Sequence, residues 1–186
     1  MYARKDLIEE GMTQYRIEKE VAEGRLLRLR RNCYVPAEAS AKDKLAAVAQ
    51  LYPDAVFTGT AALAAYGLCE VRLPATIRVD NNCRARADGL VRTVRSRPVP
   101  VNRVKGVKMA LPAQAVADAL SFERCGEWLL KEALAQAYRG LNGRGRFAAD
   151  LELVTSKKRD AVRELAEMAP VGTASKWEQR MFREMR

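Results

Sequence analysis

One basic stretch decides the fold of the N-terminal part of this 186-residue chain: Gly24-Arg25-Leu26-Leu27-Arg28-Leu29-Arg30-Arg31-Asn32-Cys33-Tyr34-Val35. Apolar and polar residues alternate along it, as they do in the strands of a hairpin. The alternation predicts a β-hairpin with one apolar side, formed by Leu27, Leu29, Cys33 and Val35. The segment 30–32 is the predicted tip, because asparagine tolerates the left-handed backbone of a tight turn. From Arg25 onward the stretch carries arginines and no acidic residue, so the hairpin is strongly basic.

Two short helices are predicted before this hairpin. The first covers residues 2–10 and ends at Gly11, and the second runs from Thr13, a good N-cap, to about Glu23. Helical spacing predicts an inner face for the second helix made of Met12, Tyr15, Ile17 and Val21. Two helices joined by a glycine turn form a helix-turn-helix. With the basic hairpin, they predict a winged helix-turn-helix that contacts duplex DNA.

Within such a domain, the second helix would read base edges and the hairpin would grip phosphates. Glutamine pairs well with adenine and arginine with guanine, so Gln14 and Arg16 are the first candidates for base readout. The alternative is an ordinary solvated helix face. The complete set of predicted DNA-binding residues is Thr13, Gln14, Tyr15, Arg16, Lys19, Arg25, Arg28, Arg30, Arg31 and Asn32.

The positive charge of the chain, +10 in total, is unevenly distributed. Residues 1–35 carry eight cations and six anions, whereas residues 72–108 carry ten cations and only two anions. This second region could extend a DNA footprint, bind RNA, hold an acidic protein, or be a solvated sheet face. The arginines assigned to this second basic surface are Arg78, Arg84, Arg86, Arg92, Arg95 and Arg97.

Several classes of chemistry have no support in the sequence. The chain has no histidine, so the usual general base, zinc ligands and Ser-His or Cys-His nucleophiles are missing. It lacks nucleotide-binding glycine motifs, and its four cysteines form no Cys-x-x-Cys pair. We therefore expect no enzyme activity, no cofactor and no metal. No apolar run approaches the ~18 residues of a membrane span, and no signal peptide is evident, so the expected location is the cytoplasm, without membrane association.

The remainder of the chain mixes strand and helix patterns. A short strand is predicted at 55–57, followed by an alanine-rich helix capped by Thr58 or Thr60, and half-exposed strands are predicted at 76–79 and 90–95. Further helices are predicted at 43–52, 111–120, 127–141, 147–153, 157–168 and 177–186. The predicted class is α+β: an N-terminal winged helix-turn-helix followed by a mixed α/β domain that is mostly helical at its end. The predicted domains are 1–37, 43–170 and a C-terminal helix at 171–186.

Three segments together resemble the AbiEi family of antitoxins and transcriptional regulators from type IV toxin–antitoxin systems, in its actinobacterial form. They are residues 24–35, Val56-Phe57-Thr58-Gly59-Thr60-Ala61-Ala62-Leu63-Ala64-Ala65-Tyr66-Gly67-Leu68, and Leu111-Pro112-Ala113-Gln114-Ala115-Val116-Ala117-Asp118-Ala119-Leu120. The resemblance implies an N-terminal winged helix that binds operator DNA and represses its own operon. It also implies a C-terminal domain that opposes a nucleotidyltransferase-like toxin. Residues 13–19 would then be the recognition helix and residues 25–32 the wing.

The chain departs from the family pattern in three places. Asn32 stands where the family often has glycine, and only two helices fit before Gly24 instead of three. The helix at 43–52 could complete the core of the winged helix, or the third helix before the wing is not needed. Residues 172–183 are similar to the entry helix of a repair-type endonuclease domain fused to many relatives. That nuclease needs further carboxylates and a lysine, and Glu178 alone cannot assemble the site, so a lost or truncated nuclease without catalysis is expected.

The leading functional prediction is a sequence-specific, double-stranded DNA-binding repressor that regulates its own toxin–antitoxin-like operon. The alternative is a non-enzymatic antitoxin or protein-interaction module that neutralises a nucleotidyltransferase-like toxin, with DNA binding secondary. A nuclease remnant ranks below both. The expected partners are operator DNA and a toxin protein, and the oligomeric state is left open.

Overall fold

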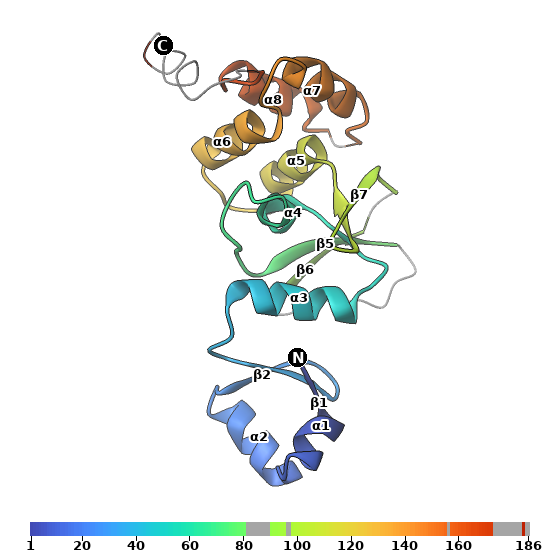
Figure 1. Cartoon of the computed structure of the whole chain (residues 1–186), viewed down its shortest axis with the longest axis vertical. Helices are drawn as coiled ribbons and strands as arrows, with labels where there is room; N and C mark the ends of the chain where they lie inside the picture. Colours follow the sequence, from blue (N-terminus) through green and yellow to red (C-terminus); the bar gives the residue numbers. More distant parts are fainter. Residues whose placement is uncertain (81–89, 96–97, 156, 173–183, 185–186) are drawn as a thin grey trace. The chain divides into compact units, whose positions relative to one another are not determined.

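The chain divides into two compact units, Met1–Pro53 and Asp54–Arg186. The computed structural model describes residues 1–80, 90–95, 98–155, 157–172 and 184. Over this part of the chain there are eight helices, a three-stranded antiparallel sheet and a five-stranded mixed sheet (Figure 1). The α+β class and the helical C-terminal end predicted from the sequence are therefore confirmed. The helix predicted at 177–186 lies almost entirely outside the described residues.

The N-terminal unit begins with two short helices joined by a tight turn. A two-residue strand, β1 (Tyr2–Ala3), leads directly into α1 (Arg4–Glu9), and α2 (Gln14–Ala22) follows. Gly11 adopts φ +88° between them, a left-handed conformation that glycine reaches without steric cost. The Met12 amide then donates to the Leu7 carbonyl oxygen at 2.9 Å. This bond satisfies an otherwise free carbonyl at the end of α1.

The second helix, α2, packs inward through Ile17. Thr13 caps the helix as predicted, accepting a hydrogen bond from the Arg16 amide at 3.2 Å. Ile17 is completely buried, with Val21 one turn further on packed against the same cluster. Tyr15 is 75% exposed, so its assignment to the inner face was wrong. Two residues along a helix correspond to a rotation of about 200°, which places Tyr15 on the face opposite Ile17.

The predicted hairpin forms from β2 (Leu26–Arg30) and β3 (Cys33–Pro36). The strands pair antiparallel, with Arg28 opposite Tyr34, and the register shifts between Arg28 and Arg30. Asn32 occupies the turn at φ 65°, the left-handed region that asparagine enters more readily than most residues. The asparagine therefore supplies the tip conformation that the turn requires.

Strand β3 of the hairpin has a buried residue on each of its faces. Strand β1 adds to β3, giving the sheet order β1-β3-β2 with Tyr2 opposite Tyr34. Tyr34 joins Leu7 and Ile17 in the core of this unit, while Val35, on the other face of the same strand, is also buried. A single apolar side was therefore an incomplete prediction, and the two-residue strand β1 was not predicted.

Helix α3 (Ala41–Leu51) closes the N-terminal unit in the chain. It begins two residues before the predicted start because the Ser40 hydroxyl accepts a hydrogen bond from the Asp43 amide at 3.1 Å. Leu45, Ala47 and Val48 are its buried residues.

The C-terminal unit is built on the five-stranded sheet. Its strands are β4 (Val56–Phe57), β5 (Ala75–Val79), β6 (Val91–Arg95), β7 (Val101–Val104) and β8 (Val107–Ala110), in the order β6-β5-β4-β8-β7. The first three were predicted from the sequence and the last two were missed. Lys105 and Gly106 connect β7 to β8 with φ values of 50° and 83°, the geometry of a two-residue hairpin turn.

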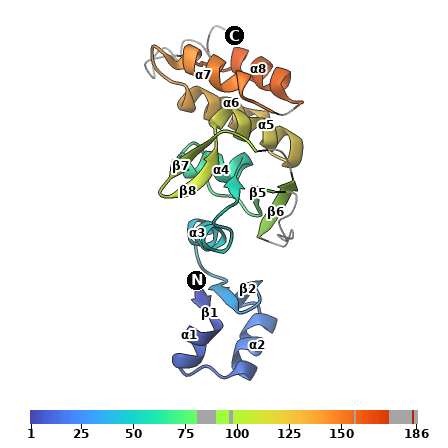
Figure 2. The same ribbon diagram turned by 90° about the vertical axis from the view of Figure 1, so that its right-hand side faces the viewer.

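Helices pack on this sheet in two tiers. Helix α4 (Gly59–Ala65) contacts the sheet at β5 and β8 and packs on α5 (Pro112–Phe122). Helix α5 then contacts α6 (Glu127–Ala137), α7 (Gly143–Glu152) and α8 (Arg159–Glu167), as Figures 1 and 2 show. Alanines line the buried side of α4 and α5, so the helices approach closely. No helix in the described ranges is both long and apolar enough to cross a membrane.

Candidate nucleic-acid interface

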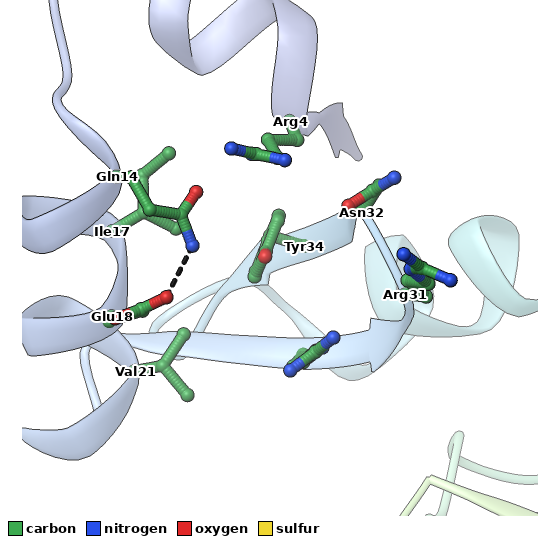
Figure 3. Close-up of a pocket in the computed structure, with 9 residues that line it drawn as sticks. Arg4, Gln14, Ile17, Glu18, Val21, Arg31, Asn32 and Tyr34 are labelled. Atoms are coloured by element: carbon green, nitrogen blue, oxygen red, sulfur yellow. Dashed lines mark hydrogen bonds between the residues drawn. The ribbon is translucent and has the colours of Figure 1, made fainter.

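A cleft of about 260 Å³ lies within the N-terminal unit, between α2 and the hairpin. Figure 3 shows Tyr34 between the Gln14–Glu18 pair of α2 on one side and Asn32 on the other. Cationic and amide side chains surround a small apolar floor. The lining residues are Arg4, Gln14, Ile17, Glu18, Val21, Arg28, Arg31, Asn32 and Tyr34.

The predicted base-reading residues of α2 fall on two sides of that helix. Gln14 and Glu18 face the cleft, where the Gln14 amide donates a hydrogen bond to the Glu18 carboxylate. Tyr15, Arg16 and Lys19 are exposed. Lys19 lies 3.9 Å from Glu23 in an exposed i,i+4 pair, which holds its ammonium weakly. The exposed face therefore presents an aromatic ring and two cations to solvent.

The hairpin places two predicted arginines beside this helix. Arg28 and Arg31 are both exposed, and both line the cleft together with Asn32 at the tip. Arg28 stands opposite Tyr34 in the strand ladder, so its side chain leaves the sheet on the same face as that of Tyr34. The side chain of Arg30 lies outside what the structure describes. The helix and the hairpin thus border one cationic cleft.

Arg25 is exposed but already paired within the protein. Its guanidinium donates to Glu20 at 2.6 and 3.0 Å and also contacts Glu23. The hydrogen bond with Arg25 lowers the pKa of Glu20, and the same pair raises the pKa of Arg25. These contacts fix the junction of α2 and β2. A DNA phosphate would therefore have to compete with Glu20 and Glu23 for the Arg25 guanidinium.

Arg78 was assigned to the second basic surface, and that assignment was wrong. The residue is only 7% exposed, and its guanidinium donates two hydrogen bonds of 2.6 Å to Asp118 of α5. Asp118 also accepts a hydrogen bond from the Thr58 hydroxyl at 2.5 Å and one from the Gln114 amide at 2.9 Å. The polar face of β5 is therefore turned toward a complementary carboxylate in the interior, not toward solvent.

A second carboxylate, that of the half-buried Glu123, lies next to this buried group. Glu123 accepts hydrogen bonds from the Thr60 amide at 3.1 Å and the Thr76 hydroxyl at 2.7 Å. Gly59 sits at φ +59°, and a Cβ atom there would meet Glu123 Oε1 at 1.9 Å. Another residue at position 59 would therefore be strained in its backbone and would displace the Glu123 carboxylate. The predicted capping of α4 by a threonine hydroxyl is replaced by this carboxylate.

Of the other residues assigned to the second basic surface, the structure describes only Arg92 and Arg95. Arg92 is half-buried and donates to the Phe122 carbonyl oxygen at 2.5 Å, while Arg95 is exposed. Arg84, Arg86 and Arg97 lie outside the described residues. Exposed cations do occur on the β7–β8 hairpin, at Arg103 and Lys105, where no strand was predicted.

Arg4 lines the cleft but was missing from the predicted site. It is the first residue of α1, and its amide donates to the Asn32 carbonyl oxygen at 2.9 Å. This bond ties the start of the chain to the hairpin tip. The pairing depends on β1, a strand of two residues that carries no periodic signal, so the sequence could not place Arg4 beside the wing.

No group of three or more histidine, cysteine, aspartate or glutamate side chains in the described part of the chain could hold a metal ion. Comparisons with models of known protein families and with curated proteins found no match to this chain.

Proposed function

We propose that the N-terminal unit is a winged helix-turn-helix that binds double-stranded DNA with sequence specificity. In this proposal α2 enters the major groove and the β2–β3 hairpin is the wing on the neighbouring backbone. One observation carries it: α2, through Gln14, lines the same cleft as the exposed Arg28 and Arg31 of the hairpin. Helices that read DNA commonly sit beside phosphate-gripping elements in this way.

The exposed residues of α2 suit base recognition. Arg16 can donate two hydrogen bonds to guanine O6 and N7, a contact that contributes about 1–3 kcal/mol of discrimination. Tyr15 adds an exposed ring next to it. Since Gln14 is bonded to Glu18, its amide would have to exchange that partner for a base. We therefore assign sequence preference mainly to Arg16.

The resemblance to the AbiEi family supports a further part of the proposal, in which the operator lies upstream of the protein's own operon and binding represses it. The second candidate function is that of an antitoxin that contacts a toxin protein. The observation that favours it is the exposed β7–β8 hairpin, an edge of the larger sheet that carries Arg103 and Lys105. An acidic surface on the toxin would complement these cations.

The experiment that tests sequence-specific binding is a fluorescence anisotropy titration of the full chain with two duplexes. One duplex is the DNA directly upstream of the protein's coding sequence, and the other is a shuffled version of equal length and composition. We expect the wild type to bind the upstream duplex at least about tenfold more tightly. Replacement of Arg16 by alanine should reduce this preference by about 1–3 kcal/mol.

The matched control is Lys5→Ala, which removes an exposed cation of α1 that pairs with Glu9 at 3.4 Å. This variant should keep the preference for the upstream duplex. Equal affinity of the wild type for both duplexes would exclude a sequence-specific role at this operator. A preference unchanged in Arg16→Ala would exclude the assigned base contact.

A further inference from the structure

Three arginines from separate segments converge on the cleft between α2 and the hairpin. Arg4 comes from the start of α1, Arg28 from β2 and Arg31 from the turn. The cleft also contains one carboxylate, that of Glu18, which accepts a hydrogen bond from the Gln14 amide. Within the described residues, the three guanidinium groups form no salt bridge with an acidic side chain.

The Arg4 side chain has a donor that no group in the described part of the protein satisfies. Its Nε atom is buried and has no hydrogen-bond partner among the described residues. A buried donor left unpaired is destabilising, and more so when it is charged. The backbone amide of Arg4, in contrast, is satisfied by the Asn32 carbonyl oxygen. Because Arg4 lines the cleft, an anion bound there would lie beside this guanidinium.

The position of the cleft identifies the anion. In B-DNA the major and minor grooves are separated by one phosphodiester strand. A protein whose helix occupies the major groove and whose wing lies over the adjacent backbone must accommodate that strand between the two elements. The cleft lies between α2 and the β2–β3 hairpin, which is the path such a strand would follow.

We propose that this cleft binds one backbone phosphate of the DNA, held by Arg4, Arg28 and Arg31. The proposal rests on the proposed DNA-binding function and adds Arg4 as a contact outside the helix and the wing. Guanidinium groups bind phosphate through two parallel N–H donors, a geometry that lysine lacks. The contact fixes the position of the wing relative to α2 on the duplex and carries no sequence information of its own.

The test compares three variants of the full chain, Arg4→Gln, Arg4→Lys and the control Lys5→Gln, on the upstream and shuffled duplexes. Lys5 is the next residue of α1, but its side chain is 83% exposed and it does not line the cleft. Removal of one charged hydrogen bond predicts about tenfold weaker binding of Arg4→Gln to both duplexes. The slope of log K against log salt should fall by about 0.9, and Lys5→Gln should change neither quantity as much.

Arg4→Lys keeps the charge and serves as the control for folding. It should retain the salt slope while recovering only part of the affinity, because lysine cannot reproduce the bidentate geometry. Thermal unfolding of all three variants checks that they remain folded. In a second arm, single phosphates of the upstream duplex are replaced by neutral methylphosphonates. Wild-type binding should weaken at one or a few positions, and Arg4→Gln should be insensitive at those same positions.

The outcomes separate this inference from the proposed function. If the wild type binds neither duplex, the proposed function and the phosphate contact both fail. If the wild type binds DNA while Arg4→Gln matches Lys5→Gln in affinity and slope, only the phosphate contact fails. The phosphate contact also fails if no methylphosphonate position weakens the wild type more than it weakens Arg4→Gln.

Discussion

Replacement of Asp118 by alanine is expected to lower the free energy of unfolding by about 3–5 kcal/mol, the usual cost of breaking a buried ion pair. Asp118 is completely buried and holds the guanidinium of Arg78, which is itself 7% exposed. The substitution would remove the carboxylate that pairs with this buried guanidinium. It would also remove the acceptor of the Thr58 hydroxyl and the Gln114 amide. Urea unfolding followed by circular dichroism measures the change.

Two further variants make this prediction specific. Asp54→Ala removes a carboxylate that is 98% exposed and pairs with Lys108 at 3.1 Å, so its effect should stay within about 0.5 kcal/mol. Asp118→Asn keeps the shape and part of the hydrogen bonding, and should fall between the two. If Asp118→Ala lowered the free energy of unfolding by less than about 1 kcal/mol, the Arg78–Asp118 pair would not be what holds β5 to α5.

The second large effect concerns the wing. Simultaneous replacement of Arg28, Arg30 and Arg31 by alanine is expected to weaken DNA binding about a hundredfold or more, given about 1.5–3 kcal/mol for each charged hydrogen bond. The weakening should be similar for the upstream and shuffled duplexes, since phosphate contacts carry no sequence information. The slope of log K against log salt should decrease by about 0.9 for each phosphate that the variant no longer neutralises. Fluorescence anisotropy at several salt concentrations gives both quantities.

The matched control for the wing is Arg25→Ala. Arg25 begins the same basic stretch and is also exposed, but its guanidinium is already paired with Glu20 and Glu23. Its replacement should therefore change the affinity far less than the triple replacement does. A comparable weakening in Arg25→Ala and the triple variant would argue against a specific wing surface. An unchanged affinity in the triple variant would exclude the hairpin from DNA binding altogether.

Local signals predicted the N-terminal elements because each one is fixed by nearby residues. Thr13 caps α2 with its own hydroxyl, and Asn32 adopts the turn conformation that its side chain tolerates. The error at Tyr15 arose from loose helical spacing. Counting from Ile17, the most buried position of α2, places Tyr15 on the outer face. The helical period, counted strictly from Ile17, therefore predicts the exposure of Tyr15 from the sequence alone.

The C-terminal unit was less predictable because its polar residues are satisfied by distant partners. Thr76 and Arg78 alternate with apolar residues as in a half-exposed strand, yet all five positions of β5 are buried. Their partners, Glu123 and Asp118, lie 47 and 40 positions later in the chain. One local signal did exist: Asp118 stands in the alanine-rich apolar segment of α5, where an acid without a buried partner would be costly.

The candidate site was predicted only in part for a similar reason. The residues of α2 and the hairpin are close together in sequence and could be grouped directly. Arg4 reaches the cleft only because β1 pairs with β3 and its amide bonds to Asn32. A pairing of two residues is too short to produce an alternating pattern, so its contribution becomes visible only in the folded chain.

The most direct test of DNA binding through α2 and the wing is an amide chemical-shift map of the full chain titrated with the upstream duplex. We expect the largest shifts on residues 13–19 and 28–32 and on Arg4, with small changes in the C-terminal unit. Shifts confined to residues 54–186, or a spectrum that the duplex leaves unchanged at low salt, would contradict DNA binding through α2 and the wing.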